Sequence, residues 1–181
     1  VTGLPSSYFF QTMKDFQAGN RKTSDPRKPN TTIMTNIAKG MSDDEIRTAA
    51  QYFGSMKWTP WIKVVESNTV PKTRPAGGMF LMEGQEKEPL GARIIETPEN
   101  AEHTEILRNP RSSFLAYVPV GSVKKGEALV KTGSGKTVQC GACHGADLRG
   151  MGPVPPLAGR SPSYVVRQMF DMKQGNRKGE W

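Results

Sequence analysis

The chain has 181 residues, of which 35% are hydrophobic, and it contains 19 glycines and 14 prolines. That length suffices for one good core or two small ones, and the composition indicates a loop-rich protein. No apolar run approaches the roughly 20 residues that span a bilayer. The net charge is +8, which favours a protein partner with an acidic surface. The lysines and arginines are scattered along the chain instead of forming a stripe, which argues against nucleic acid as the partner.

The first predicted element is a helix that ends at Gly19. Phe9, Met13 and Phe16 recur at helical spacing and so lie on one face. A glycine at this place is a common helix stop. We therefore expect an amphipathic helix whose apolar stripe belongs to a core.

Within residues 31–54, the sequence predicts a second helix that begins after Ser42 and runs to about Phe53. Ser42 and Glu45 have the spacing of a capping box, in which each side chain accepts from the backbone of the other. Gly54 then predicts the end of this helix. Met34 precedes it in a stretch predicted as a loop, and the chain has nine methionines, most of which should simply pack in cores.

Residues 58–120 contain three β-prone runs, WTPWIKVVE, ARIIET and FLAYVPV. We interpret KTRPAGG and EGQEKEPLG as the connections between them, together with a charged stretch around His103. The segment is predicted as a linker with a small sheet. Trp58 and Trp61 are expected to pack against the first domain, and His103 to be a solvated loop residue.

Both cysteines of the chain and one of its two histidines lie in VQCGACHGADLRG, as Cys140, Cys143 and His144. A zinc site would need about four ligands, and the only other histidine is His103. A thioredoxin-like pair requires a βαβ context, and a disulfide would close too short a loop to add much stability. The spacing instead favours covalent haem c, in which two thiols bond the macrocycle and the imidazole binds iron.

A repeat accounts for the helix that follows. Residues 157–178 align with residues 1–22 without gaps at an offset of 156, and nine of 22 positions are identical, including a Gly-Asn-Arg-Lys run. Val165, Met169 and Met172 form an apolar face like that of the first copy. We expect this face to be one wall of a haem pocket.

These motifs resemble those of the small two-haem cytochromes c of the bacterial periplasm, which consist of two class-I domains. The matching segments are CGACHG at 140–145, PPLAG at 155–159, the two copies of the helix, and IMTNIAKGMSDDEI at 33–46. The resemblance implies a mainly α fold of class-I cytochrome c helical domains, with a loop-rich linker that carries a few short β-strands.

The resemblance also assigns site residues. It implies that Cys140 and Cys143 carry the thioether bonds of one haem c and that His144 is the proximal iron ligand. Pro155 matches the proline whose carbonyl orients that imidazole. Met34 matches the distal ligand, and a thioether suits haem iron and raises its reduction potential.

The same resemblance predicts how the chain is divided. Residues 1–57 would be the C-terminal part of a first cytochrome domain, 58–120 a linker, and 121–181 the N-terminal part of a second domain. Met41 is the second choice for the distal ligand. Gly126 matches the small residue at which the first and last helices of such a domain cross.

The first domain lacks its own CxxCH and the second its distal methionine. We therefore expect the chain to be a piece of a longer protein that binds two haems. An upstream CxxCH behind a signal peptide and a methionine soon after Trp181 would complete it. The alternative is a permuted domain in which Met34 completes the iron bound by His144.

The functional expectation is a periplasmic single-electron carrier in a respiratory or dehydrogenase-linked chain, not an enzyme. Its partners would be redox proteins with acidic docking surfaces, and neither nucleic acid nor a transmembrane segment is expected. The alternative is a catalytic, peroxidase-like haem protein with an open iron site.

Overall fold

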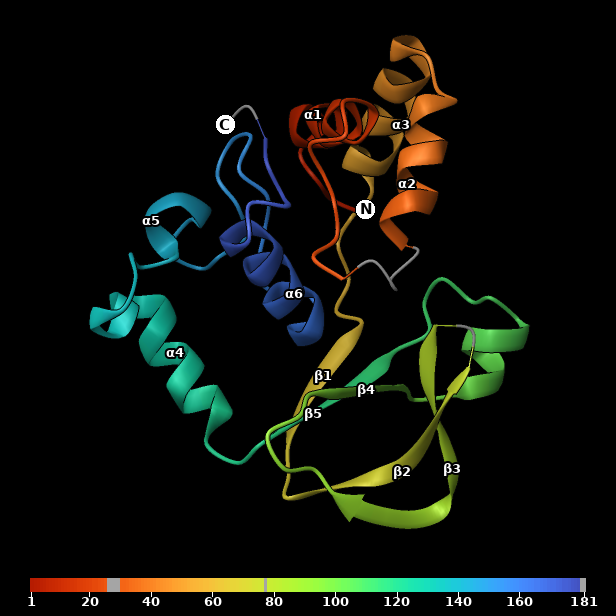
Figure 1. The fold of residues 1–181 in the computed structure, drawn as a ribbon, viewed down its shortest axis with the longest axis vertical. Coiled ribbons are helices and arrows are strands. Elements are labelled where there is room, and N and C mark those ends of the chain that lie inside the picture. Colours follow the sequence, from red (N-terminus) through yellow and green to blue (C-terminus); the bar gives the residue numbers. More distant parts are fainter. Residues whose placement is uncertain (26–29, 77, 180–181) are drawn as a thin grey trace. The chain divides into compact units, whose positions relative to one another are not determined.

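The computed structural model describes residues 1–25, 30–76 and 78–179, and its contacts divide the chain into two compact units. The first unit comprises Val1–Trp58, Cys143–Ala158 and Tyr164–Trp181. The second comprises Thr59–Ala142 and Gly159–Ser163. Helices dominate the first unit and short strands the second (Figure 1). The predicted domain boundaries after residues 57 and 120 stay predictions.

Three helices build the core of the first unit: α1 (Ser6–Gln17), α2 (Asn30–Lys39) and α3 (Asp43–Ser55). Helix α1 packs against both α2 and α3. The apolar face predicted for α1 is the face that it buries, and the buried core residues are Phe9, Met13, Ala38, Ile46 and Ala50.

The capping box predicted at the start of α3 is present. The Glu45 backbone N–H donates to Ser42 Oγ at 3.3 Å, and the Ser42 N–H donates to Glu45 Oε2 at 2.8 Å. These bonds from the Ser42 backbone and hydroxyl lower the pKa of Glu45. Because folding lowers this pKa, the ionised Glu45 side chain stabilises the fold at pH values above the ordinary carboxyl pKa. This stabilisation is lost as the pH falls through the lowered pKa.

Removing the cap tests this. Ser42→Ala is expected to lower the free energy of unfolding at neutral pH by about 1 kcal/mol, because one backbone N–H loses its acceptor. The loss should shrink as acid protonates Glu45, which urea unfolding over a pH series would measure. Ser55→Ala, at the other end of α3, removes only a bond to the Tyr52 carbonyl and should change little. Equal losses in the two variants would contradict the capping role.

Gly54 does not stop α3, which continues to Ser55. A Cβ added to Gly54 would lie 2.7 Å from Ser6 Oγ and 3.1 Å from the Leu4 carbonyl oxygen. Ser6 Oγ itself donates to the Ala50 carbonyl at 3.0 Å. Gly54 therefore allows α3 to approach the start of α1 closely, a constraint that local sequence does not reveal.

Met34 lies on α2, so the prediction of a loop at this position was wrong. The sequence of α2, NTTIMTNIAK, has many Asn, Thr and Ile residues, whose intrinsic helix propensities are modest. Packing of α2 on α1 outweighs those propensities. The Met34 side chain is half-buried against the helical core.

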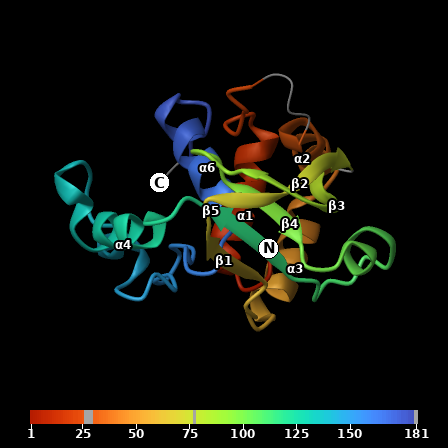
Figure 2. The same cartoon turned by 90° about the horizontal axis from the view of Figure 1, so that it is seen from below.

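The second unit contains a three-stranded sheet and a separate hairpin, which Figure 2 shows from a second side. The sheet has the order β1-β5-β4, with β1 and β5 parallel and β4 antiparallel to β5. Its strands are β1 (Ile62–Glu66), β4 (Ile95–Pro98) and β5 (Phe114–Val118). The hairpin pairs β2 (Thr69–Ala76) with β3 (Met79–Pro89).

The hairpin corrects the sequence interpretation, because KTRPAGG and EGQEKEPLG contribute to β2 and β3 rather than connecting strands; Gly77 lies outside the described residues. Most β3 side chains are exposed. The sequence of β3 therefore lacks the alternation of apolar and polar residues from which a strand is predicted. Trp61 packs edge-on against Phe114 within the second unit, whereas Trp58 lies in the first unit, beside Gly3. His103 is exposed, as expected, but it lies in the short π-helix η1 (Glu102–Ile106) rather than in a loop.

The remaining α-helices are α4 (Ser122–Thr132), the single turn α5 (Gly141–His144) and α6 (Pro162–Lys173), and the short helix η2 (Gly133–Gly135) follows α4. The predicted second copy of the repeat is thus a helix, and Gly19 and Gly175 follow α1 and α6 with φ values of 73° and 69°. These left-handed conformations favour glycine. Among the described residues, no helix has the length and apolar character needed to cross a membrane.

The two Gly-Asn-Arg-Lys runs pair with each other inside the first unit. The Lys22 N–H donates to the Asn176 carbonyl at 2.6 Å, and the Lys178 N–H donates to the Asn20 carbonyl at 2.9 Å. Between them, Arg21 and Arg177 form an antiparallel bridge. The repeated sequence therefore binds its own second copy.

A buried ion pair lies next to this bridge. Asp15 is 1% exposed, and its Oδ2 accepts from Arg21 Nη2 at 3.0 Å and Arg21 Nε at 3.2 Å. Gln11 Nε2 donates to the other carboxylate oxygen at 3.2 Å. A two-pronged guanidinium bond of this kind compensates a carboxylate for its lost water.

Candidate functional site

Cys140 precedes α5, and Cys143 and His144 lie within this single turn. The Cys140 N–H donates to the Val130 carbonyl at 3.1 Å, which ties the motif to the end of α4. Both cysteines are free thiols, Cys140 half-buried and Cys143 exposed. Residues three apart on a helical turn are neighbours on its surface. The local fold therefore gives the two sulfurs a spacing that one flat macrocycle can bridge.

The ring of His144 is held by Pro155. His144 Nδ1 lies 2.8 Å from the Pro155 carbonyl oxygen. A carbonyl only accepts, so Nδ1 carries a proton and donates it, which leaves Nε2 as the ring nitrogen that could bind a metal. A second bond of this kind fixes the tautomer and orientation of a metal-binding imidazole and raises its basicity. The contact expected from the resemblance is present.

The loop between these two residues is closed by backbone hydrogen bonds. The Gly150 N–H donates to the His144 carbonyl at 2.9 Å, and the Leu157 N–H donates to the Leu148 carbonyl at 2.8 Å. Gly150 has a φ of 90°, and a Cβ added there would lie 2.7 Å from the Val154 carbonyl oxygen. Only glycine fits at this position, which keeps the chain compact behind the imidazole.

Helix α6 presents an apolar face to solvent. Met13 of α1 is 5% exposed, whereas its counterpart in the repeat, Met169, is 54% exposed. Met172, on the same face, is likewise more than half exposed. A contiguous apolar surface on a helix normally marks a binding surface. The same repeated face thus packs against protein in the first copy and is open in the second.

These observations meet the requirements of haem c. The thiols of Cys140 and Cys143 would be the attachment points, and His144 would be an oriented nitrogen donor. The open face of α6 suits the apolar surface of a porphyrin. Gly150 is the residue of this site that the sequence interpretation missed, and the only signal for it was the glycine-rich stretch after the motif.

The other predicted residues lie elsewhere in the fold. Met34 and Met41 both pack against the helical core of the first unit. Gly126 lies in α4, and a Cβ added there would meet only open space. The roles predicted for these three residues stay predictions.

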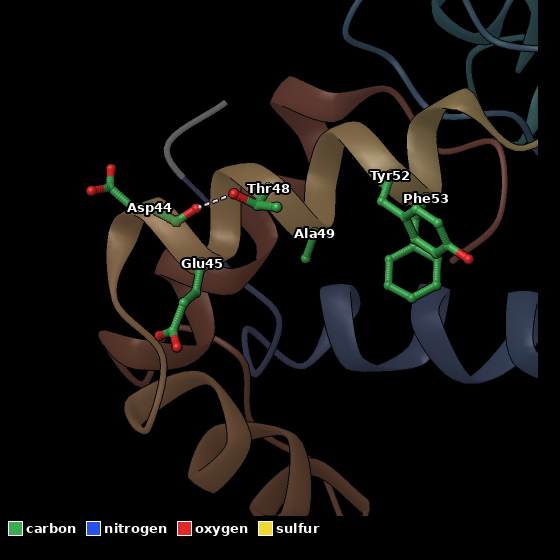
Figure 3. Close-up of a pocket in the computed structure, with 6 residues that line it drawn as sticks. All are labelled: Asp44, Glu45, Thr48, Ala49, Tyr52 and Phe53. Carbon is green, nitrogen blue, oxygen red and sulfur yellow. Dashed lines mark hydrogen bonds between the residues drawn. The ribbon is translucent and has the colours of Figure 1, made fainter.

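A shallow hollow along α3 is not part of this site (Figure 3). Its lining comes from one face of the helix, with acidic residues at one end and aromatic rings at the other, and contains neither cysteine nor histidine. The lining residues are Asp44, Glu45, Thr48, Ala49, Tyr52 and Phe53.

No protein-family model matches the chain. Over 48 residues it is 46% identical to cytochrome c4 of Azotobacter vinelandii, a match that covers 26% of this chain and 23% of that protein. Over 68 residues it is 42% identical to cytochrome c4 of Stutzerimonas stutzeri, covering 37% of this chain and 32% of that protein. The matches therefore span between 23% and 32% of the length of these curated relatives.

The fold is also that of a solved cytochrome c4. The structure from Acidithiobacillus ferrooxidans superposes with a TM-score of 0.57 at 20% sequence identity, covering 99% of this chain and 73% of that chain. The chain is related to the two-haem class-I cytochromes c. The predicted fold class, mainly α with short strands, is confirmed. Covalently bound haem c is the cofactor of this family, and the thiols and imidazole described above fit it.

Proposed function

We propose that this chain belongs to a periplasmic c-type cytochrome that passes single electrons between redox partner proteins and catalyses no reaction of its own. The observation that carries the proposal is the 2.8 Å contact between His144 Nδ1 and the Pro155 carbonyl oxygen. It prepares one imidazole nitrogen for iron, directly after two free thiols. The likeness to cytochrome c4 proteins supports an electron carrier over a peroxidase-like enzyme.

Each residue has one task in this proposal. The thiols of Cys140 and Cys143 would hold the haem through two thioether bonds, each formed by addition of one S–H across one vinyl group. His144 Nε2 would bind the iron, while Pro155 holds the ring. When bound, haem c supplies an iron that alternates between two oxidation states and so carries one electron at a time. Haem attachment of this type takes place outside the cytoplasm, which supports the periplasm as the location.

The test is to express the chain with a periplasmic haem-ligation system. We expect the mass of one haem per chain, pigment that resists acid–acetone extraction, and a reversible one-electron redox titration. Pigment that is extracted by acid–acetone, or a titration that is irreversible, would overturn the proposal.

Met34 is proposed as the distal iron ligand of the haem that the first domain would bind in the longer two-haem protein, with Met41 as the second choice. A thioether bound to that iron would slow carbon monoxide binding, because it would have to leave first. In the longer protein, Met34→Ala is therefore expected to speed carbon monoxide binding to the reduced haem of the first domain by at least about tenfold, whereas Met41→Ala, the matched control, should not. Stopped-flow absorption measures both rates. Equal rates in the wild type and Met34→Ala would contradict ligation by Met34.

The net charge of +8 supports partners with acidic docking surfaces. We expect electron transfer to such a partner to slow as ionic strength rises, since the Debye length is about 8 Å at physiological salt. Stopped-flow rates at low and high salt would measure this, with a neutral small-molecule reductant as the control. A partner rate that does not change with salt would show that the charge serves only solubility.

A further inference from the structure

A carboxylate of the second unit binds the start of α6. Glu96 lies on β4, and both of its carboxylate oxygens accept from Ser161 Oγ at 2.7 Å. Glu96 Oε1 also accepts from the Ser163 backbone N–H at 2.9 Å. Ser161 is only 8% exposed, so water competes little for these bonds.

This contact is a helix cap supplied by a distant segment. Ser161 and Ser163 flank Pro162, the first residue of α6. The first N–H groups of a helix have no partner within it, and the helix dipole favours a negative charge at that end. Glu96 satisfies one such N–H and places its charge there, although it is 67 residues away along the chain.

The repeat supplies a natural comparison. Ser161 of the second copy corresponds to Pro5 of the first, and Pro5 has no hydroxyl to donate. Pro5 is the N-cap residue of α1, and its side chain forms no capping hydrogen bond with that helix. The second copy therefore differs from the first at the residue that Glu96 binds.

The capped helix is also the one with the open apolar face. Met169 and Met172 lie on one face of α6 and are more than half exposed, and we assign this face to the haem. The first two residues of α6, Pro162 and Ser163, belong to the same compact unit as β4. Glu96 therefore contacts the part of α6 that lies in its own unit.

We propose that Glu96 is a positioning residue, which through Ser161 and Ser163 fixes the start of α6 and hence the apolar face that lies against haem. The proposal rests on the proposed function. A purely structural role would lower stability without altering the redox equilibrium. A positioning role changes the surroundings of the iron and therefore changes that equilibrium.

Glu96→Gln keeps the size of the side chain and removes its charge. Glu83→Gln, on an exposed part of β3, makes the same charge change away from α6 and is the matched control. In the holoprotein we expect Glu96→Gln to speed amide hydrogen exchange in the first turn of α6 about tenfold. We also expect it to change the equilibrium constant for reduction about threefold more than Glu83→Gln does.

Ser161→Ala removes the hydroxyl donor and should produce both effects in the same direction, even if Glu96→Gln fails to fold. The double variant should add little to either single one, because the two residues share one contact. Exchange and redox equilibrium that match those of the Glu83→Gln control would overturn the positioning role and leave the proposed function intact. A protein that binds no haem would overturn the proposed function instead, and with it the role of this face.

Discussion

Replacing both thiols, as in Cys140→Ala with Cys143→Ala, is expected to abolish covalent haem attachment. The chain has no other cysteine, so no other thiol can form the bond. Mass spectrometry after acid–acetone extraction should find only the mass of the polypeptide. Each single variant keeps one thiol and should retain a covalent haem at reduced yield. The control is Gln139→Ala, which alters the same segment and leaves both thiols in place.

The single variants also test the geometry of α5. Cys143 is exposed within the turn, whereas Cys140 is half-buried and bound through its N–H to the end of α4. We expect either thiol to suffice for one bond, because the same turn carries His144 to the iron. Covalent haem that persists in the double variant would show that attachment uses another residue and would refute the motif.

Arg21→Ala is expected to lower the free energy of unfolding by about 3 kcal/mol, the cost of leaving a buried carboxylate without its cation. Asp15 is 1% exposed and Arg21 13%, so solvent screens this pair only weakly. Gln11 remains beside the carboxylate in the variant but carries no charge. Urea or guanidinium unfolding measures the change.

The repeat provides the control for this variant. Arg177 corresponds to Arg21, but its guanidinium donates to the hydroxyl of Tyr8 and the amide of Gln168. Both acceptors are neutral, so Arg177→Ala should cost only about 1 kcal/mol. Arg21→Lys should lie between the two, because lysine keeps the charge without the two-pronged fork. Equal losses in Arg21→Ala and Arg177→Ala would show that the Asp15 pair adds no more than an ordinary hydrogen bond.

The helices that could be predicted from sequence are those with local signals. The apolar stripe of α1, its second copy in α6 and the capping box of α3 each depend on residues within a few positions of one another. Helix α2 and the hairpin β2–β3 lacked such signals. In α2, tertiary packing outweighs propensity, and in the hairpin a backbone ladder forms between largely exposed strands.

The candidate site divides in the same way. Cys140, Cys143 and His144 lie within five residues of one another, so a haem c site could be predicted from their spacing alone. Pro155 came from the resemblance, and its carbonyl lies where that resemblance placed it. Gly150 and Glu96 act through contacts that only the folded chain creates. No pattern in the sequence distinguishes them from other loop glycines and strand carboxylates.

The paired Gly-Asn-Arg-Lys runs have the symmetry of a homodimer. Asn20 meets Lys178 and Lys22 meets Asn176, which is the exchange of equivalent partners that a two-fold axis imposes on identical subunits. A single ancestral unit could have formed this contact with a second copy of itself. Joining the two copies in one chain replaces a concentration-dependent association by an intramolecular one, at an effective concentration set by the linker. A substitution in a homodimer alters both halves of such a contact at once, whereas in one chain each copy can change alone, as the difference between Pro5 and Ser161 outside this contact illustrates.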